Sequence, residues 1–449
     1  MGKNNTVENF KREYKQAMIN CCTNFSERVC ELYNYYQINL KAINNDYQQK
    51  KEKYSIAFKI LDSFNSVYKC KTPEEQIAKF KEIKNNQICD NKKLKDLFAK
   101  IDFDEEEIGF SYVFKPEIRN FKDFLPSKAR KINKIYLYSI SRLKTSILSS
   151  LVSTYESFLS SVYSNLIYNN RSLYFGSRTI TLQELISNDL DDIIEKQIDE
   201  IVESDMYDSI DLTKTIFEKE KIAQNEIAKT IEEFIEICSR RNIYIHNDGN
   251  VNKLYLSAVP SCNAKVGTYL KCDDKYYINS IISIQKLMFF MTFRLLEKEK
   301  MDDDVIEQIL DFYFEKLANK EYEITEFVYR VLSSSKKLDF ASKMICEVNY
   351  LISLKYLHKE KEFNDEISTF DVSASEKPFK IAKLILLNKF QEASKLIEES
   401  YDSEKTPNEL LNWPLYQDFR CTDFYKEIVK NHSKDFAFEE LSGDDSGLL

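Results

Sequence analysis

The sequence predicts an all-α protein with a long heptad-patterned helix in its N-terminal region and helical hairpins towards its C-terminus. Gly and Pro, the residues that most often interrupt helices, occur only seven times each among 449 residues. Apolar side chains recur at helical spacing along much of the chain. We therefore expect few sharp turns and little β-structure.

The length of the chain predicts two or three domains, because single domains seldom reach 449 residues. We expect a helical N-terminal region over residues 1–139, a central domain over 140–297 and a C-terminal helical domain over 298–438. A charge-rich break marks the start of the last domain. The acidic residues 439–449 are expected to form a flexible tail.

Composition narrows the classes of partner. The net charge of −9 gives no global attraction to nucleic acid, so any RNA contact needs a local basic patch. No apolar run approaches the roughly 20 residues of a membrane span, and the N-terminus lacks a signal-peptide core. We therefore expect a cytoplasmic protein without membrane contact.

Metal and cofactor chemistry finds little support in the sequence. The ten cysteines are irregularly spaced and form no CxxC pair, so we interpret them as reduced, structural thiols. The three histidines, His246, His358 and His432, lie far apart along the chain. We therefore expect neither a metal site nor a cofactor.

The N-terminal region contains a heptad seam, in which apolar and aromatic residues alternate in steps of four and three. The seam starts at Val29, and Lys50 is its single charged member, which either fixes the register or marks a break. It predicts either a dimerising coiled coil or a helix that folds back within its own monomer. We favour the second, because tyrosine-rich seams are atypical of parallel zippers. After Val29 the seam runs through Tyr33, Tyr36, Leu40, Ile43, Tyr47, Lys50, Tyr54, Ala57, Leu61, Phe64 and Tyr68.

A new helix is expected after this seam. Thr72 can act as its N-cap, Pro73 suits the first helical position, and the following glutamates complete a capping box.

Nine basic residues stand against two acidic ones between Lys115 and Lys144. Such a patch can guide an RNA backbone electrostatically, or it can form a solvated face balanced by the acidic segment from Glu184 to Asp208. The basic residues are Lys115, Arg119, Lys122, Lys128, Arg130, Lys131, Lys134, Arg142 and Lys144. As candidate RNA-binding residues we name Lys128, Arg130, Lys131 and Lys134.

The central domain begins with an amphipathic helix between Ile147 and Leu166. Glu156 lies on the flank of its apolar arc, where the carboxylate either reaches a cation on a neighbouring helix or is simply exposed. Thr181 and Glu184 predict a capping box, and the acidic helix after it alternates with isoleucines as a solvated amphipathic helix does.

The central feature is a helix whose apolar stripe ends in polar residues. Ile231, Phe234 and Cys238 recur at core spacing. Continuing at about 100° per residue brings Arg241, Asn242 and Ile245 onto the same stripe, with His246 at its edge. Burying such groups is costly unless they are paired, so the stretch is either a satisfied polar cluster or a functional site. The helix should end just after His246, with Gly249 available for a left-handed cap.

These residues resemble the signature of HEPN domains, most closely those of bacterial abortive-infection and phage-defence proteins. The resemblance consists of Arg241, Asn242 directly after it, His246 four residues further on, and the run from Asn247 to Asn252. An earlier helix bearing Glu156 fits the same pattern. About 160 residues, from 140 to 297, are covered.

The resemblance implies a helical bundle that forms a homodimer or higher homo-oligomer, with two R-x4-H motifs facing one another. It further implies metal-independent cleavage of RNA, in which the 2′-OH attacks the adjacent phosphate and leaves a 2′,3′-cyclic phosphate. His246 is then the candidate general acid or base, Arg241 stabilises charge on the phosphorane, and Asn242 orients the motif or phosphate. Glu156, Arg240 and Asn247 are supporting candidates, and Arg240 could replace Arg241 as phosphate ligand.

The expected function is thus a toxin or effector ribonuclease in antiviral defence, with RNA as substrate and a possible regulatory protein partner. The alternative is a noncatalytic HEPN-like scaffold that has kept the fold without cleavage.

The C-terminal region should contain a tetratricopeptide-like helical hairpin over residues 379–393, with Ala382 and Ala393 permitting close helix packing. Thr406 and Pro407 predict the start of the next helix. One such unit establishes no repeat period. Its expected role is to pack on the central domain or to sense a partner.

Overall fold

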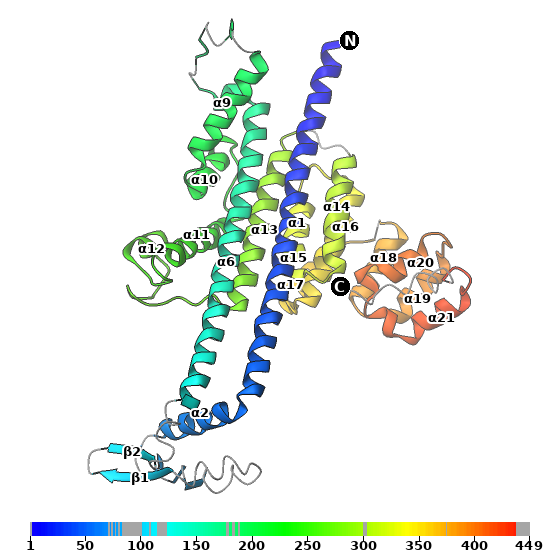
Figure 1. Ribbon diagram of the computed structural model, residues 1–449. Helices are drawn as coiled ribbons and strands as arrows, with labels where there is room; N and C mark the ends of the chain where they lie inside the picture. The colour runs from blue at the N-terminus through cyan, green and yellow to red at the C-terminus, as the bar shows by residue number, and fades with distance from the viewer. Residues whose placement is uncertain are drawn as a thin grey trace. The chain divides into compact units, whose positions relative to one another are not determined.

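The computed structural model describes residues 2–70, 101–106, 109–114, 124–176, 189–299, 303–373 and 375–436, together with a few positions within 72–82 and 179–186. The predicted all-α class is confirmed, and one two-stranded antiparallel hairpin accompanies the helices (Figure 1). None of the described helices is both long and apolar enough to cross a membrane. The predicted tail over 439–449 lies outside the described residues.

The chain forms two compact units. Unit 1 comprises Met1–Arg28, Val152–Leu270 and Ile278–Leu449, and unit 2 comprises Val29–Leu151 and Lys271–Tyr277. Each unit therefore draws on segments that are distant in sequence, and the predicted boundaries at 139/140 and 297/298 stay predictions.

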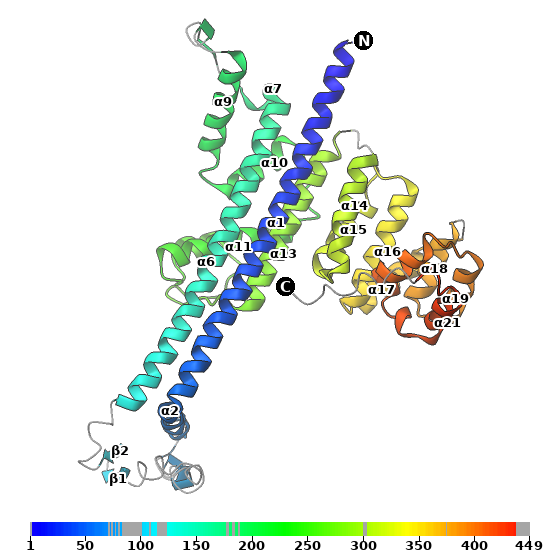
Figure 2. The same cartoon turned by 45° about the vertical axis from the view of Figure 1, so that its right-hand side comes forward.

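Unit 2 is built on the second part of α1 (Gly2–Lys53) and the first part of α6 (Phe124–Asn169), which lie side by side in Figures 1 and 2. Between them along the chain come α2 (Ser55–Tyr68) and the paired strands β1 (Ile101–Glu106) and β2 (Gly109–Phe114). Ile101 pairs with Phe114 in the hairpin.

The heptad seam packs against α6 of the same chain. Tyr47 stacks on Tyr136 with ring centroids 4.1 Å apart, and its hydroxyl donates to Asn133 Oδ1 at 2.8 Å. Tyr36 is buried earlier in the seam, and Leu61 is buried in α2. Residues of α6 in the same chain thus cover the seam. This is the arrangement predicted for a helix that folds back within its own monomer.

Lys50 precedes a break in this helix. α1 ends at Lys53, and Tyr54 leaves the helical conformation with φ −111° and ψ 31° before α2 begins. Further on, Thr72 Oγ1 accepts a hydrogen bond from the backbone N–H of Glu75 at 3.2 Å, as the predicted N-cap requires. Pro73, between them, lies outside the described residues.

Unit 1 is organised around α13 (Asp274–Leu296), from Ile278 onwards. Phe290 and Met291 are fully buried. Phe217 and Phe327 each approach the Phe290 ring with centroids 6.4 Å apart. Those two residues belong to α10 (Ser209–Lys219) and α15 (Tyr322–Ser333). Other helices of the first half of unit 1 are α7 (Arg171–Tyr174), α9 (Leu190–Asp205), α11 (Ala228–His246) and α12 (Lys253–Ala258).

The acidic helix behaves as predicted for a solvated amphipathic element. α9 buries Ile194, Ile198 and Ile201, while Asp199 and Glu200 between them are exposed. Glu184, in the predicted capping box, lies outside the described residues.

The C-terminal part of unit 1 consists of helical hairpins that share one turn. Lys320, His358 and Asn388 all have positive φ, at 64°, 55° and 57°. In each turn the next residue's N–H returns to the carbonyl five residues back, as Lys389 does to Leu384. The helices are α14 (Asp303–Ala318), α15, α16 (Phe340–Tyr356), α17 (Glu360–Thr369), α18 (Lys377–Leu386), α19 (Phe390–Glu399), α20 (Thr406–Asn412) and α21 (Asp423–Asn431).

The predicted hairpin over 379–393 is α18 and α19, and Ala382 and Ala393 are both fully buried. The structure adds two further hairpins with the same turn, α14–α15 and α16–α17. The turn residues are 38 and 30 positions apart, so the three hairpins share a turn without setting a fixed repeat period.

The shared turn makes a prediction at His358, which is exposed and has φ 55°. His358→Gly should be more stable than His358→Val by about 1–2 kcal/mol, because a β-branched residue is strained in the left-handed region. The free energy of unfolding is measured in urea by the fluorescence of Trp413, the single tryptophan. Trp413 reports on this region because its indole N–H donates to Asn349 of α16 at 3.0 Å. Glu362, which is exposed within helix α17, is the control position. There the Gly variant should be no more stable than the Val variant. Equal stability of the two His358 variants would contradict the account.

Candidate active site on helix α11

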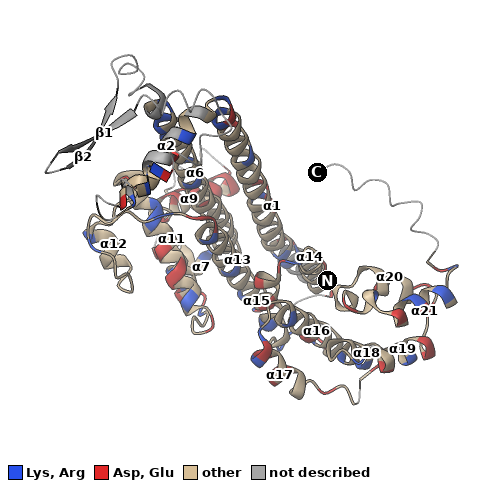
Figure 3. Cartoon of the chain, turned by 90° about the horizontal axis from the view of Figure 1, so that it is seen from below, with Lys and Arg blue, Asp and Glu red and all other residues tan. Residues whose placement is uncertain are grey.

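Helix α11 is fixed by the apolar stripe that the sequence predicts. Ile231, Phe234 and Cys238 are buried, and the Phe234 ring lies 4.6 Å from that of Tyr155 on α6. Figure 3 shows acidic and basic residues both present along the α11 ribbon, and in the sequence of α11 the two arginines come near its end. One side of α11 therefore packs in the core of unit 1 while its last turns carry the polar groups.

The expected continuation of this stripe holds for Arg241, which is 21% exposed, and is wrong for Asn242 and Ile245. Asn242 and His246 are exposed, and Ile245 keeps 51% of its surface accessible. The buried side instead turns to Ile243, which packs with Val251 and other residues near α12 in a small separate cluster. The covering core ends before the helix does, so Asn242 and His246 lie on an open edge while Arg241 stays largely buried.

Arg241 is held by Glu156 of α6. Arg241 Nη2 lies 2.5 Å from Glu156 Oε1, and the two side chains are 21% and 29% exposed. The sequence left open whether Glu156 reaches a neighbouring cation or is simply exposed, and the structure shows that it reaches Arg241. Arg241 Nε is buried and has no hydrogen-bond partner among the described residues, so this guanidinium keeps an unused donor.

Cys238 lies close to this pair, because the charges of both Arg241 and Glu156 act on its thiol. Burial is the dominant influence and raises the pKa of Cys238 to about 12, while the Arg241 charge opposes the rise. The thiol stays protonated at neutral pH, so Cys238 is no nucleophile at this site.

Arg240 is engaged elsewhere. Its Nε lies 2.7 Å from Glu236 Oε1, and the same oxygen accepts a hydrogen bond from the Tyr255 hydroxyl at 2.6 Å. Burial and the neighbouring Glu236 raise the pKa of Tyr255, which keeps this hydroxyl protonated. Arg240 thus helps to hold α12 on α11, and Arg241 is the arginine with a donor to spare.

The turn after His246 is held by several hydrogen bonds. Asn247 Nδ2 donates to the Asn250 carbonyl at 2.6 Å, and Asn250 Nδ2 donates back to the Asn247 carbonyl at 3.2 Å. Gly249 has φ +76°, as its predicted left-handed position requires, and its N–H reaches the Ile243 carbonyl at 3.0 Å. Asn247 therefore shapes the turn that ends the helix at His246.

The site thus offers three groups suited to a phosphodiester. Arg241 supplies a cation and a spare N–H, Asn242 an exposed amide, and His246 an exposed imidazole. Arg241 is turned towards α6, whereas His246 lies open to solvent, and no hydrogen bond or ion pair joins the two. Among the described residues, no three His, Cys, Asp or Glu side chains are placed to hold a metal ion.

The candidate RNA-binding residues belong to unit 2, in the first turns of α6. Arg130, Lys131 and Lys134 are exposed. Lys128 is half-buried, with its Nζ 5.1 Å from the centroid of the Tyr54 ring. Three other basic residues of the predicted patch, Lys115, Arg119 and Lys122, lie outside the described residues.

Comparison with known proteins adds no family. No protein-family model matches the chain, and no match was found among curated proteins or solved structures. The likeness to HEPN domains therefore rests on the motif in α11 and the residues around it.

The turn after His246 predicts a clear difference between two glycines. A Cβ at Gly249 would lie 2.6 Å from Tyr269 Cε2 and 2.7 Å from Tyr244 Cε1, whereas a Cβ at Gly267, also at positive φ, meets nothing within 4 Å. Gly249→Ala should thus lower the free energy of unfolding by about 1–3 kcal/mol more than Gly267→Ala, which pays backbone strain alone. Urea unfolding and amide exchange of α12 measure the effect. Equal losses would show that the turn is not closely packed.

Proposed function

We propose that this protein is a metal-independent endoribonuclease that cleaves RNA at the end of α11. The observation that carries the proposal is the state of Arg241: paired with Glu156, yet with a buried Nε that has no partner among the described residues. A phosphate oxygen would satisfy that donor once the guanidinium turned outward, since Nε itself is buried. Asn242, the next residue, and His246, little more than one turn further on, are both exposed.

The chemistry needs one proton removed and one supplied. A general base takes the proton of the 2′-OH, the freed oxygen attacks the adjacent phosphorus, and the bond from phosphorus to the 5′-oxygen breaks. A general acid protonates that leaving oxygen, which gives a 2′,3′-cyclic phosphate and a 5′-OH. His246 is suited to either proton transfer, and Arg241 to the added negative charge of the phosphorane. Glu156 acts as a positioning residue for Arg241.

A second copy of the chain would complete the site. Residues 241 and 246 are separated by five steps of about 100°, so on one helix they diverge by about 140°. Arg241 accordingly reaches α6 while His246 lies exposed beside Ile245. We place the face of Ile245 and His246 at a homodimer interface, so that Arg241 of one copy serves with His246 of the other. Higher homo-oligomers would repeat this contact.

In this proposal the protein acts in the cytoplasm as a toxin or effector of antiviral defence. The three C-terminal hairpins offer a surface for a regulatory protein partner. The competing function is a noncatalytic HEPN-like scaffold, in which the pair of Arg241 and Glu156 only stabilises the fold. Cleavage of RNA by the purified protein in EDTA separates the two.

Purified full-length protein should cleave total RNA in the presence of EDTA. His246→Ala should lower the rate about 10²–10⁴-fold and Arg241→Ala about 10²–10³-fold, because each removes a group that acts in the transition state. Two matched variants should retain activity: His358→Gly removes another exposed histidine, and Lys229→Ala removes a cation from an 89% exposed position on α11. Intact RNA with the wild-type protein, with and without phage-infected cell extract, would favour the scaffold.

A composite site predicts complementation between two inactive variants. When His246→Ala and Arg241→Ala proteins are mixed in equal amounts and allowed to exchange subunits, half of the dimers are mixed, and each mixed dimer holds one intact site. Activity should then return to about a quarter of the wild-type value. No recovery after exchange, verified by native mass spectrometry, would place Arg241 and His246 in the same copy's site.

A further inference from the structure

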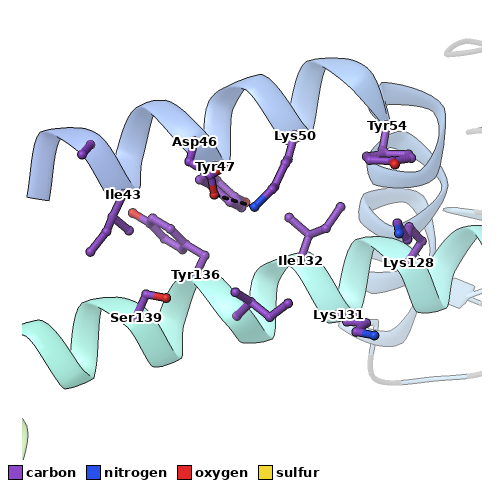
Figure 4. Close-up of a pocket in the computed structure, with 12 residues that line it drawn as sticks. Ile43, Asp46, Tyr47, Lys50, Tyr54, Lys128, Lys131, Ile132, Tyr136 and Ser139 are labelled. Carbon is purple, nitrogen blue, oxygen red and sulfur yellow. Dashed lines mark hydrogen bonds and ion pairs between the residues drawn. The ribbon is translucent and has the colours of Figure 1, made fainter. Parts of the chain in front are cut away.

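Unit 2 contains a cleft that the ribonuclease proposal does not use. It has a volume of about 460 Å³ and lies between the end of α1 and the start of α6 (Figure 4). Its volume falls within the range of about 300–1,000 Å³ typical of small-molecule sites. The cleft is lined by Ala42, Ile43, Asp46, Tyr47, Lys50, Tyr54, Lys128, Lys131, Ile132, Ile135, Tyr136 and Ser139.

Aromatic rings form a fixed wall of this cleft. Tyr47 and Tyr136 stack at 4.1 Å with 23° between their planes, and each hydroxyl is tied to an asparagine of the opposite helix. Tyr47 donates to Asn133 at 2.8 Å, and Tyr136 donates to Asn44 at 2.9 Å. The wall is therefore already ordered without a ligand, which lowers the entropy cost of binding.

Cations gather at the end of the cleft near the break between α1 and α2. Figure 4 shows Lys128 beside Tyr54 there, with Lys131 one turn further along α6. Lys50 is paired with Asp46 at 2.7 Å, whereas neither Lys128 nor Lys131 forms an ion pair with any described residue. Lys128 is half-buried, so an anion seated here would compensate a partly desolvated charge.

We propose that this cleft binds a nucleotide, with the phosphate at Lys128 and Lys131 and the base against Tyr136 and Ile132. A flat apolar body joined to an anion matches a site in which tyrosine faces and isoleucines adjoin two lysines without carboxylate partners among the described residues. The nucleotide is either free or part of a single-stranded RNA. The site uses unit 2 alone and does not depend on cleavage at α11.

The proposal divides the basic patch predicted from the sequence. Lys128 and Lys131 line the cleft, whereas Arg130 and Lys134, on the same turns of α6, do not. A purely electrostatic patch would use all four equally. A cleft requires only the first pair.

The test compares two double variants that remove the same charge from the same helix. Full-length protein carrying His246→Ala, which avoids loss of RNA during the measurement, is titrated against a fluorescein-labelled 12-nucleotide single-stranded RNA by anisotropy. Lys128→Ala with Lys131→Ala should weaken binding about tenfold or more, whereas Arg130→Ala with Lys134→Ala should change it by roughly twofold at most. Tyr54→Leu should also weaken binding, because it removes the ring that holds the Lys128 ammonium at the cleft.

Unlabelled AMP and ATP identify the source of the nucleotide. Displacement of the RNA by either at submillimolar concentration assigns the cleft to a free nucleotide, and RNA binding that resists them assigns it to a strand. Equal weakening by the two double variants would overturn the proposal, as would the absence of binding to all three probes. Cleavage by the wild-type protein in EDTA is a separate readout, so failure of the cleft and failure of the ribonuclease proposal can be told apart.

Discussion

A guanidinium that is about four-fifths buried has to be neutralised, and the carboxylate that neutralises Arg241 comes from another helix. The pair of Arg241 and Glu156 joins α11 to α6 at the point where the apolar contacts of Phe234 and Tyr155 have ended. It therefore fixes the direction in which the last turns of α11 leave the core. His246 follows on that projecting end, and the turn at Gly249 packs between Tyr244 of α11 and Tyr269.

The same pair explains why the site keeps binding capacity. Glu156 contacts one end of the guanidinium, Nη2, and leaves Nε buried without a partner in the described part of the chain. A guanidinium that is held in place but has an N–H without an acceptor is suited to bind the negatively charged phosphate of RNA. Arg240 shows the contrast, since Glu236 holds its Nε in a contact that serves packing.

Sequence reasoning predicted the parts of the site that depend on short-range spacing. The burial of Ile231, Phe234 and Cys238 follows from helical periodicity, and the left-handed position of Gly249 follows from the lack of a side chain. Periodicity gives the direction of a stripe but not the length over which another element covers it. The exposure of Ile245 could therefore not be predicted, because it depends on where the packing of α6 stops.

Features made by residues distant in sequence were harder to predict. The repeated turn of the C-terminal hairpins uses Lys320, His358 and Asn388, three different residue types, so no sequence signature marks it. The cleft of unit 2 joins Tyr54 to Lys128 through the fold-back of α1 on α6, and neither segment alone indicates it. The heptad seam predicted either a dimerising coiled coil or this fold-back, and its tyrosine content favoured the fold-back.

The most direct test of the central claim is the chemistry of the RNA ends that the protein produces. Cellular RNA from cells expressing the wild-type chain is sequenced with a ligation that captures 2′,3′-cyclic phosphate ends, alongside cells expressing His246→Ala. The account predicts discrete sites with 2′,3′-cyclic phosphate and 5′-OH ends that vanish in the variant, since attack by the 2′-OH leaves no other products. New ends with 3′-OH and 5′-phosphate, or cyclic ends that persist with His246→Ala, would contradict it.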